Sequence, residues 1–203
     1  MFIELTDHLR CPAPHPEHFL VLLPDEIVAR SVLTGRLGCP VCGRTYAVIE
    51  GVAELGAAPD LEAGHALEAG VAHVLLGLQG PGGYAVLVGS AASTWRELAE
   101  LNPGVALVAV NPPGRIAEAA PVLSVLRSSI IPLKSRSMRG VVLGGEFSAA
   151  PTWIAEAGRV TLPGLRVVGL GPEPAVAELD LLASAEGCWV ATPSGAAPRH
   201  YSL

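Results

Sequence analysis

The chain has 203 residues, of which 50% are hydrophobic and 16% are charged. This composition supplies enough apolar material for a packed core and excludes an intrinsically disordered protein. The formal net charge of −6 disfavours a general nucleic-acid-binding function, because such proteins carry an excess of Lys and Arg. The longest apolar runs fall short of the ~18–20 residues that cross a bilayer, and MFIELTDHLRCP does not read as a signal peptide. We therefore expect a cytoplasmic protein without a membrane segment.

Two turns in the N-terminal part predict a structural zinc site. Cys39-Pro-Val-Cys42-Gly43 has the spacing at which two thiolates converge on one ion. Cys11 opens a similar turn upstream, where Pro14 stands in the place expected for a second cysteine. A histidine can replace that thiolate, and His15, directly after the turn, is favoured over His18. The predicted Zn²⁺ ligands are Cys11, His15, Cys39 and Cys42.

Two other interpretations of these residues remain open. A redox-active CxxC pair needs a helix after the motif, whereas residues 44–49 form a β-rich run without a helical period. Alternatively, His15 and His18 are surface histidines and the metal site is incomplete. A module of about 55 residues with few large apolar side chains needs a further source of stability, such as a metal. This need favours the zinc site.

Residues 2–56 resemble a known family in the order of these features. LTDHLRCP, a strand near residues 19–23, a variable segment and then GRLGCPVCGRTYAVIEGVAEL resemble the zinc-ribbon activator subunit of tRNA and translation-factor methyltransferases. The ending at residues 46–53 is similar to the family's Tyr-Pro-Ile followed by Asp-Gly-Ile-Pro. His15 departs from the family, which has a cysteine there. The resemblance implies a zinc ribbon that contacts a methyltransferase partner by a β-zipper.

The remaining residues, 57–203, show apolar strands alternating with helical segments. Thr94-Trp95-Arg96-Glu97 reads as a capping box that begins one of the helices. Helices are predicted at 60–78, 94–102, 115–127, 151–157 and 172–185, and strands at 84–89, 106–110, 130–133, 140–143, 165–170 and 188–192. This alternation predicts an α/β fold: an open, mostly parallel, Rossmann-like sheet with helices on both faces. The predicted domains are a zinc ribbon (1–56) and the Rossmann-like domain (57–203).

The second domain resembles the S-adenosylmethionine-dependent methyltransferase fold over residues 76–192. The similarity rests on residues 85–89, on 131–133 followed by 139–143, and on 159–168. In open parallel sheets, ligands bind beyond the carboxyl ends of the strands, which makes Gly89, Ser90 and Asn111 the predicted cofactor-binding residues. The first loop lacks the family's acid, and Asn111 replaces the acid that holds the ribose. We therefore expect S-adenosylmethionine to bind weakly or not at all.

Three functions follow from these features, and no catalytic residue is predicted. The first is a non-catalytic, zinc-binding scaffold or binding protein that contacts a protein partner through the ribbon. The second is a methyltransferase with an altered cofactor pocket. The third is a nucleic-acid or ribosome-associated module, for which the segment 127–139 supplies basic residues and no acid: Arg127, Lys134, Arg136 and Arg139.

Overall fold

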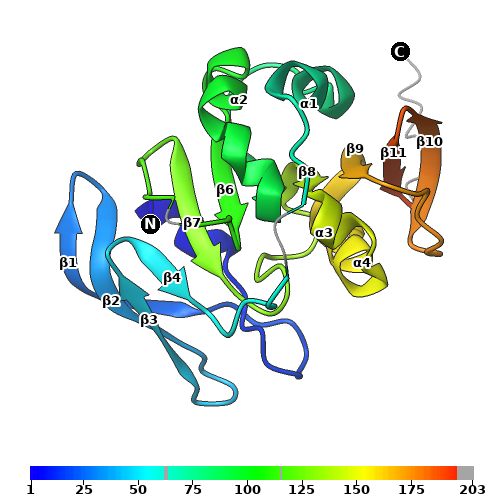
Figure 1. Ribbon diagram of the computed structural model, residues 1–203. Helices are drawn as coiled ribbons and strands as arrows, with labels where there is room; N and C mark the ends of the chain where they lie inside the picture. The colour runs from blue at the N-terminus through cyan, green and yellow to red at the C-terminus, as the bar shows by residue number, and fades with distance from the viewer. Residues whose placement is uncertain (62–63, 115, 196–203) are drawn as a thin grey trace, which may run out of the picture.

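The computed structural model describes residues 1–61, 64–114 and 116–195. Within them, one mixed sheet runs through the molecule in the order β1-β2-β3-β4-β7-β6-β5-β8-β9-β11-β10 (Figure 1). The strands are β1 (Val21–Val28), β2 (Ser31–Gly38), β3 (Thr45–Ile49), β4 (Val52–Glu54), β5 (Tyr84–Val88), β6 (Ala106–Val110), β7 (Leu123–Arg127), β8 (Met138–Leu143), β9 (Thr161–Leu170), β10 (Leu179–Ala185) and β11 (Cys188–Pro193). The helices are η1 (Ile3–His8), α1 (Ala69–Leu76), η2 (Gly89–Thr94), α2 (Trp95–Leu101), α3 (Gly145–Ser148) and α4 (Pro151–Val160).

The centre of the sheet is parallel. The parallel strands pair in the order β7-β6-β5-β8-β9. After β5 the chain adds β6 and β7 on one side of β5, and it then returns to place β8 and β9 on the other side. This reversal is the switch point of a doubly wound α/β fold. The strands β11 and β10 then complete one edge in antiparallel orientation. The predicted α/β fold with a parallel sheet is confirmed.

Alternate side chains of the central strands enter two different cores. Val86 and Val88 pack in the core that contains η1 and α4, whereas Ala85 and Leu87 pack against α1 and α2. Such strands are buried on both faces, which explains the continuous apolar run of β5. Helices cover both faces, as expected, but α4 shares its face with fully buried N-terminal side chains: Met1, Leu5 and Leu9.

The N-terminal β-meander, β1 to β4, extends the same sheet beyond β7. Its strands pair in antiparallel order, and residues 29–30 and 50–51 connect neighbouring strands with positive φ angles, as type I′ hairpin turns require. Strand β4 then pairs in parallel with β7, matching Val52 with Val125 and Glu54 with Arg127. The backbone hydrogen bonds of one sheet therefore connect the meander to the parallel strands. The division at residue 56 stays a prediction.

Two predicted helices are strands in the structure. The segment 115–127 contains β7, with residue 115 outside the described residues, and the segment 172–185 contains β10. The composition of the second segment favours a helix locally. However, Glu186 and Gly187 both adopt positive φ angles and form a two-residue turn that pairs Ala185 with Cys188. Pairing with β11 overrides the local preference.

Three smaller predictions also differ from the structure. The strand predicted at 130–133 is a loop with a single bridge between Leu133 and Leu9. The helix predicted at 60–78 is confined to α1 among the described residues, and 62–63 lie outside them. Thr94 does not close a capping box, because its hydroxyl donates to the carbonyl of Leu67. A threonine that bonds to another segment is no longer available to cap its own helix.

An ion-pair network ties the loop after Cys11 to α4. The Arg10 guanidinium donates to both carboxylate oxygens of Glu156, at 3.0 and 2.8 Å. Arg159 donates to the same carboxylate at 2.8 and 2.9 Å, and it also reaches Glu17 at 3.1 Å. The Ser135 hydroxyl donates to Glu17 at 2.6 Å. Glu156, 18% exposed, therefore bridges Arg159 of its own helix and Arg10, which lies 146 residues earlier in the sequence.

We predict that Glu156→Gln lowers the free energy of unfolding by about 1–2 kcal/mol, because the amide keeps the shape but leaves two guanidinium groups without their anion. Urea unfolding followed by circular dichroism measures the change. The matched control is Glu97→Gln, an exposed residue of α2 without an ion pair among the described residues. Equal stability of the two variants would contradict a structural role for the network.

Candidate functional site

The four residues predicted to hold zinc lie together in the structure. The ligand atoms of Cys11, His15, Cys39 and Cys42 all lie within 4.8 Å of one another, and we call this group the Cys/His cluster. The Sγ atoms of Cys11 and Cys42 are 3.8 Å apart. Metal–sulfur bonds of about 2.3 Å place two ligands of a tetrahedron about 3.8 Å apart, so the spacing fits one shared ion. His18 lies outside the group and packs on Phe19, with ring centroids 4.5 Å apart.

Tight backbone geometry brings these ligands together. The Gly43 N–H donates to the Cys39 carbonyl at 3.0 Å, and Gly43 adopts a φ of +70°, which glycine accepts without strain. Burial alone would raise the pKa of the Cys39 thiol. The N–H groups of Cys42 and Val41, together with neighbouring thiols, instead lower this pKa to about 6. The turn thus stabilises a thiolate at the position of a metal ligand.

Tyr46 also belongs to the cluster, and the sequence analysis did not identify it. Its hydroxyl lies 3.3 Å from the Sγ of Cys11. Burial raises the pKa of Tyr46 above its ordinary value, so the phenol stays protonated and can donate to the sulfur. Tyr46 lies on β3 directly after the Cys39–Gly43 turn, and that position was the available signal. Such a hydrogen bond orients a metal ligand from outside the coordination sphere.

The loop after β5 holds a carboxylate that belongs to the protein itself. Gly89 and Ser90 lie at the carboxyl end of β5, as predicted. The Ser90 N–H donates to one oxygen of Glu146 at 2.7 Å, and the Ser90 hydroxyl donates to the other at 2.7 Å. The Gly64 N–H adds a third hydrogen bond, at 3.1 Å. The donors that would receive a polar ligand are therefore already engaged.

Neighbouring residues also leave little free space around Gly89 and Ser90. A Cβ added at Gly89 would lie 2.3 Å from the Glu146 carboxylate and 2.4 Å from the ring of Phe147. The segment before α1 crosses the same place, because the His65 carbonyl accepts from the Ser90 hydroxyl at 2.9 Å. Glu146 was not identified from the sequence. Its position two residues after Gly144, at the end of β8, places it opposite the β5 loop, and this was the only local signal.

Asn111 lies at the carboxyl end of β6, but its side-chain amide forms hydrogen bonds with the backbone of Ser128. Its Nδ2 donates to the Ser128 carbonyl at 2.7 Å, and its Oδ1 accepts from the Ser128 N–H at 2.9 Å. The side chain is buried, and the backbone adopts a φ of +51°. Asparagine tolerates this left-handed conformation better than most residues. In the structure, Asn111 fastens the end of β7 to the end of β6.

The cavity left beside Asn111 has a volume of about 240 Å³. Glu146 and Phe147 form part of its wall, whereas Gly89 and Ser90 do not. The structure therefore does not bring the three predicted cofactor residues into one cavity among the described residues. Ligand pockets typically measure about 300–1,000 Å³, so this space is small for a nucleoside cofactor.

Two of the basic residues between 127 and 139 contact other parts of the protein. Arg127 lies 3.7 Å from the carboxylate of Glu54, at the end of β4. Arg139 donates to backbone carbonyls of the loop before β5, including that of Gly80 at 2.9 Å. These two side chains therefore stabilise the fold of the protein itself.

Comparisons with known proteins give structural similarities alone. No protein-family model and no curated protein matches the chain. A SAM-dependent methyltransferase from Aquifex aeolicus is similar at 15% identity and a TM-score of 0.44, over 61% of this chain and 87% of that one. A chain of the complex between the Haloferax volcanii Trm112 methyltransferase activator and a proposed methyltransferase is similar at 19% identity and a TM-score of 0.41, over 50% of each chain.

A proposed sarcosine dimethylglycine methyltransferase from Galdieria sulphuraria is similar at 16% identity and a TM-score of 0.39. The match covers 50% of this chain, which spans only 44% of the Galdieria protein. Separately, none of the described helices combines the length and the apolar character needed to span a membrane.

We predict that His15→Ala loses bound zinc, whereas His18→Ala retains it. His15 Nε2 lies 3.4 Å from the Cys39 sulfur inside the cluster, and His18 lies outside it. Elemental analysis of protein purified without added metal should give about one zinc per wild-type chain, since structural sites in zinc-finger peptides bind with about 10–16 kcal/mol. Equal zinc retention in the two variants would exclude His15 as the fourth ligand.

We predict that Asn111→Asp destabilises the protein by about 1–3 kcal/mol, because a carboxylate can accept from the Ser128 N–H but repels the Ser128 carbonyl. Thermal unfolding measures the change, and Asn111→Gly separates the side-chain bonds from the left-handed backbone, which glycine adopts freely. If Asn111→Asp were as stable as the wild type, Asn111 would not have the backbone-fastening role assigned above.

Proposed function

We propose that this chain is a non-catalytic, zinc-binding scaffold with a methyltransferase-like fold. The observation that carries the proposal is the Glu146 carboxylate, bound by Ser90 at 2.7 Å in the loop where a cofactor is expected. A ligand would have to displace that carboxylate and the segment at His65 together. The hydrogen bonds of Ser90 to Glu146 thereby connect the loop after β5 to α3.

Asn111 further supports weak binding of S-adenosylmethionine. The resemblance described above assigns an acid to the ribose, whereas Asn111 already uses its amide on Ser128. Losing a charged hydrogen-bond partner costs about 1.5–3 kcal/mol. That loss alone weakens binding about 10- to 100-fold, since each 1.4 kcal/mol corresponds to about a factor of ten. Displacing Glu146 adds to this cost.

We further propose that residues 1–56 form a zinc ribbon and residues 57–203 a methyltransferase-like domain. Three cysteines and one histidine would occupy all four tetrahedral positions of Zn²⁺, which makes the metal structural. The ribbon resembles an activator subunit that joins its partner by a β-zipper. Here β4 pairs with β7 inside one chain, which supports a ribbon that serves its own fold. The proposed setting is the cytoplasm, where thiols remain reduced.

The outer strand of the ribbon is the proposed surface for a partner protein. Strand β1 ends the sheet and has an unpaired edge among the described residues. Its exposed apolar side chains include Leu23, 50% exposed, and Val28, 52% exposed. An edge strand with exposed apolar side chains readily pairs with another chain. These properties suit a binding protein.

We predict that calorimetry detects no binding of S-adenosylmethionine to the wild type at cofactor concentrations of about 100 μM. Glu146→Ala frees the Ser90 N–H and hydroxyl and should gain at least about tenfold in affinity, because the competing carboxylate is gone. Glu173→Ala, which removes an exposed carboxylate without a hydrogen bond among the described residues, should behave like the wild type.

A wild-type dissociation constant below about 20 μM would overturn the scaffold proposal and favour the methyltransferase with an altered pocket. The same conclusion would follow if the purified protein already contained the cofactor. A gel shift that weakens steeply with salt would instead favour the nucleic-acid-binding module, because phosphate contacts release counterions.

A further inference from the structure

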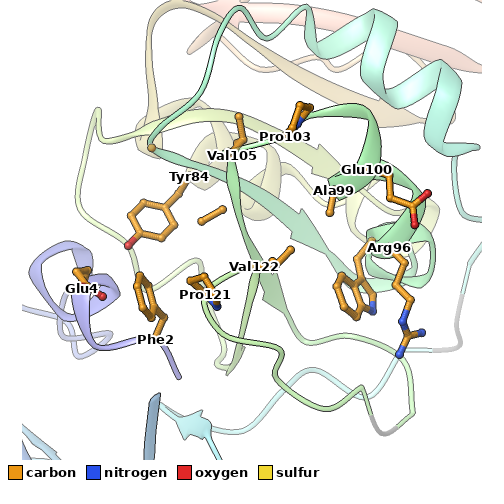
Figure 2. A pocket seen from close by; sticks show the side chains of 14 residues that line it. Phe2, Glu4, Tyr84, Arg96, Ala99, Glu100, Pro103, Val105, Pro121 and Val122 are labelled. Carbon is orange, nitrogen blue, oxygen red and sulfur yellow. The ribbon is translucent and has the colours of Figure 1, made fainter. Parts of the chain in front are cut away.

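A second, larger pocket lies at the amino ends of the parallel strands, opposite to the carboxyl ends that hold Gly89 and Asn111. Its volume is about 720 Å³, against about 240 Å³ for the cavity beside Asn111. Its floor includes Tyr84 at the start of β5 and Ala106 at the start of β6, so it opens at the amino ends of the strands. The volume lies within the range of about 300–1,000 Å³ that is usual for small-molecule sites. We call it the amino-edge pocket (Figure 2).

The walls of the amino-edge pocket are mostly apolar and come from four separate segments. Phe2 lies on one side, before η1, and Trp95 lies on the other, in α2. In the view of Figure 2, Pro121 and Val122 lie between Phe2 and Arg96, the residue that follows Trp95. Aromatic and aliphatic side chains with few polar groups are the usual lining of a ligand pocket.

Backbone hydrogen bonds hold the rim in place. The Gly82 N–H donates to the Gly104 carbonyl at 2.7 Å, which fastens the loop before β5 to the loop before β6. The Val122 N–H donates to the Ala119 carbonyl at 2.8 Å, and the Leu107 N–H donates to the Val122 carbonyl at 2.7 Å. The pocket is therefore formed before any ligand arrives, which lowers the entropic cost of binding.

One hydroxyl in the amino-edge pocket has no partner. The Tyr84 side chain is 8% exposed, and its hydroxyl makes no hydrogen bond with the described residues. Figure 2 shows the hydroxyl pointing toward Phe2 and Glu4. Burial raises the pKa of the Tyr84 phenol, so it remains protonated and available as a donor at neutral pH. Tyr84 belongs to the lining of the pocket, so a ligand bound there can accept a hydrogen bond from its hydroxyl.

The charged groups around the amino-edge pocket compensate one another. Glu4 forms an ion pair with Arg30, outside the lining. Arg96 lies over the Trp95 ring, with its guanidinium carbon 4.7 Å from the ring centroid. Glu100 follows one helical turn later on the same helix, so the rim carries one charge of each sign. The second oxygen of Glu4, Oε2, has no hydrogen-bond partner among the described residues. However, the charge of Glu4 is paired with Arg30 and the rim carries one charge of each sign, which gives no strong attraction for an anion or a cation.

We propose that the amino-edge pocket binds a neutral, largely apolar small molecule that presents a hydrogen-bond acceptor, such as a carbonyl oxygen, to the Tyr84 hydroxyl. The apolar body would lie between Phe2, Val122 and Trp95. The site is separate from the loop at Gly89 and independent of the scaffold proposal, because the two lie at opposite ends of β5.

The test uses prodan, a neutral naphthalene dye with a ketone group whose emission shifts to the blue in apolar surroundings and to the red when its carbonyl accepts a hydrogen bond. Wild-type protein should bind it saturably with a dissociation constant of roughly 10 μM. Tyr84→Phe should weaken binding about 3- to 10-fold. The emission of the bound dye should also move further to the blue in this variant, a change that a purely structural role of Tyr84 would not produce.

Val122→Trp should weaken binding more than about tenfold by filling the pocket, because the residue is 39% exposed and lies at the rim. Val74→Trp makes the same change on the outer surface of α1, where the residue is 69% exposed, and should leave binding unchanged. Circular dichroism verifies that both variants fold, and Tyr84→Phe tests the site without any added volume.

Three results would overturn the proposal. The first is the absence of saturable prodan binding to the wild type below about 100 μM. The second is equal prodan binding by wild type and Val122→Trp. The third is tighter binding of the anionic dye anilinonaphthalene sulfonate than of prodan, which would assign the pocket to an anionic ligand that uses Arg96.

Discussion

The parallel pairing of β4 with β7 determines how the two halves of the chain are combined. Its three residue pairs continue the sheet from the meander into the parallel strands. A short strand of this kind contributes few hydrogen bonds, and the ion pair of Arg10 with Glu156 adds a second attachment between the N-terminal segment and α4. Because Arg10 directly precedes Cys11, this attachment lies next to the Cys/His cluster in the sequence.

At the carboxyl ends of the parallel strands, polar groups of the protein bind one another. The switch point at β5 leaves a position where parallel α/β folds bind ligands. Here a short helix, α3, returns a carboxylate to the backbone donors at Ser90, and Asn111 uses its amide to fasten β7. Both contacts stabilise the sheet with the groups that would otherwise face a ligand. A larger pocket lies at the amino ends of these strands, where Phe2 and α2 contribute to its lining.

The features that were predicted from the sequence depend on short-range signals. The Cys39–Cys42 spacing and the two apolar runs that became β5 and β6 lie within single segments, and the structure has them at those positions. Strand β10 was predicted as a helix because its composition is helical, and only its pairing with β11 makes it a strand. The contact of Glu146 with Ser90 joins residues 56 positions apart, and the position of Glu146 after β8 is the only local signal for it. The amino-edge pocket is likewise formed by residues from four separate segments: 2–4, 83–84, 95–106 and 121–122.

The buried N-terminal segment has a consequence for the order in which the protein acquires its structure during synthesis. The Phe2 N–H donates to the Ser124 hydroxyl at a separation of 122 residues, and Arg10 reaches Glu156 at a separation of 146. Chains whose contacts join distant residues fold slowly, because the loop between the partners must close first. Leu5 and Leu9 therefore lack part of their core until α4 has left the ribosome, so this segment completes its packing long after it is translated.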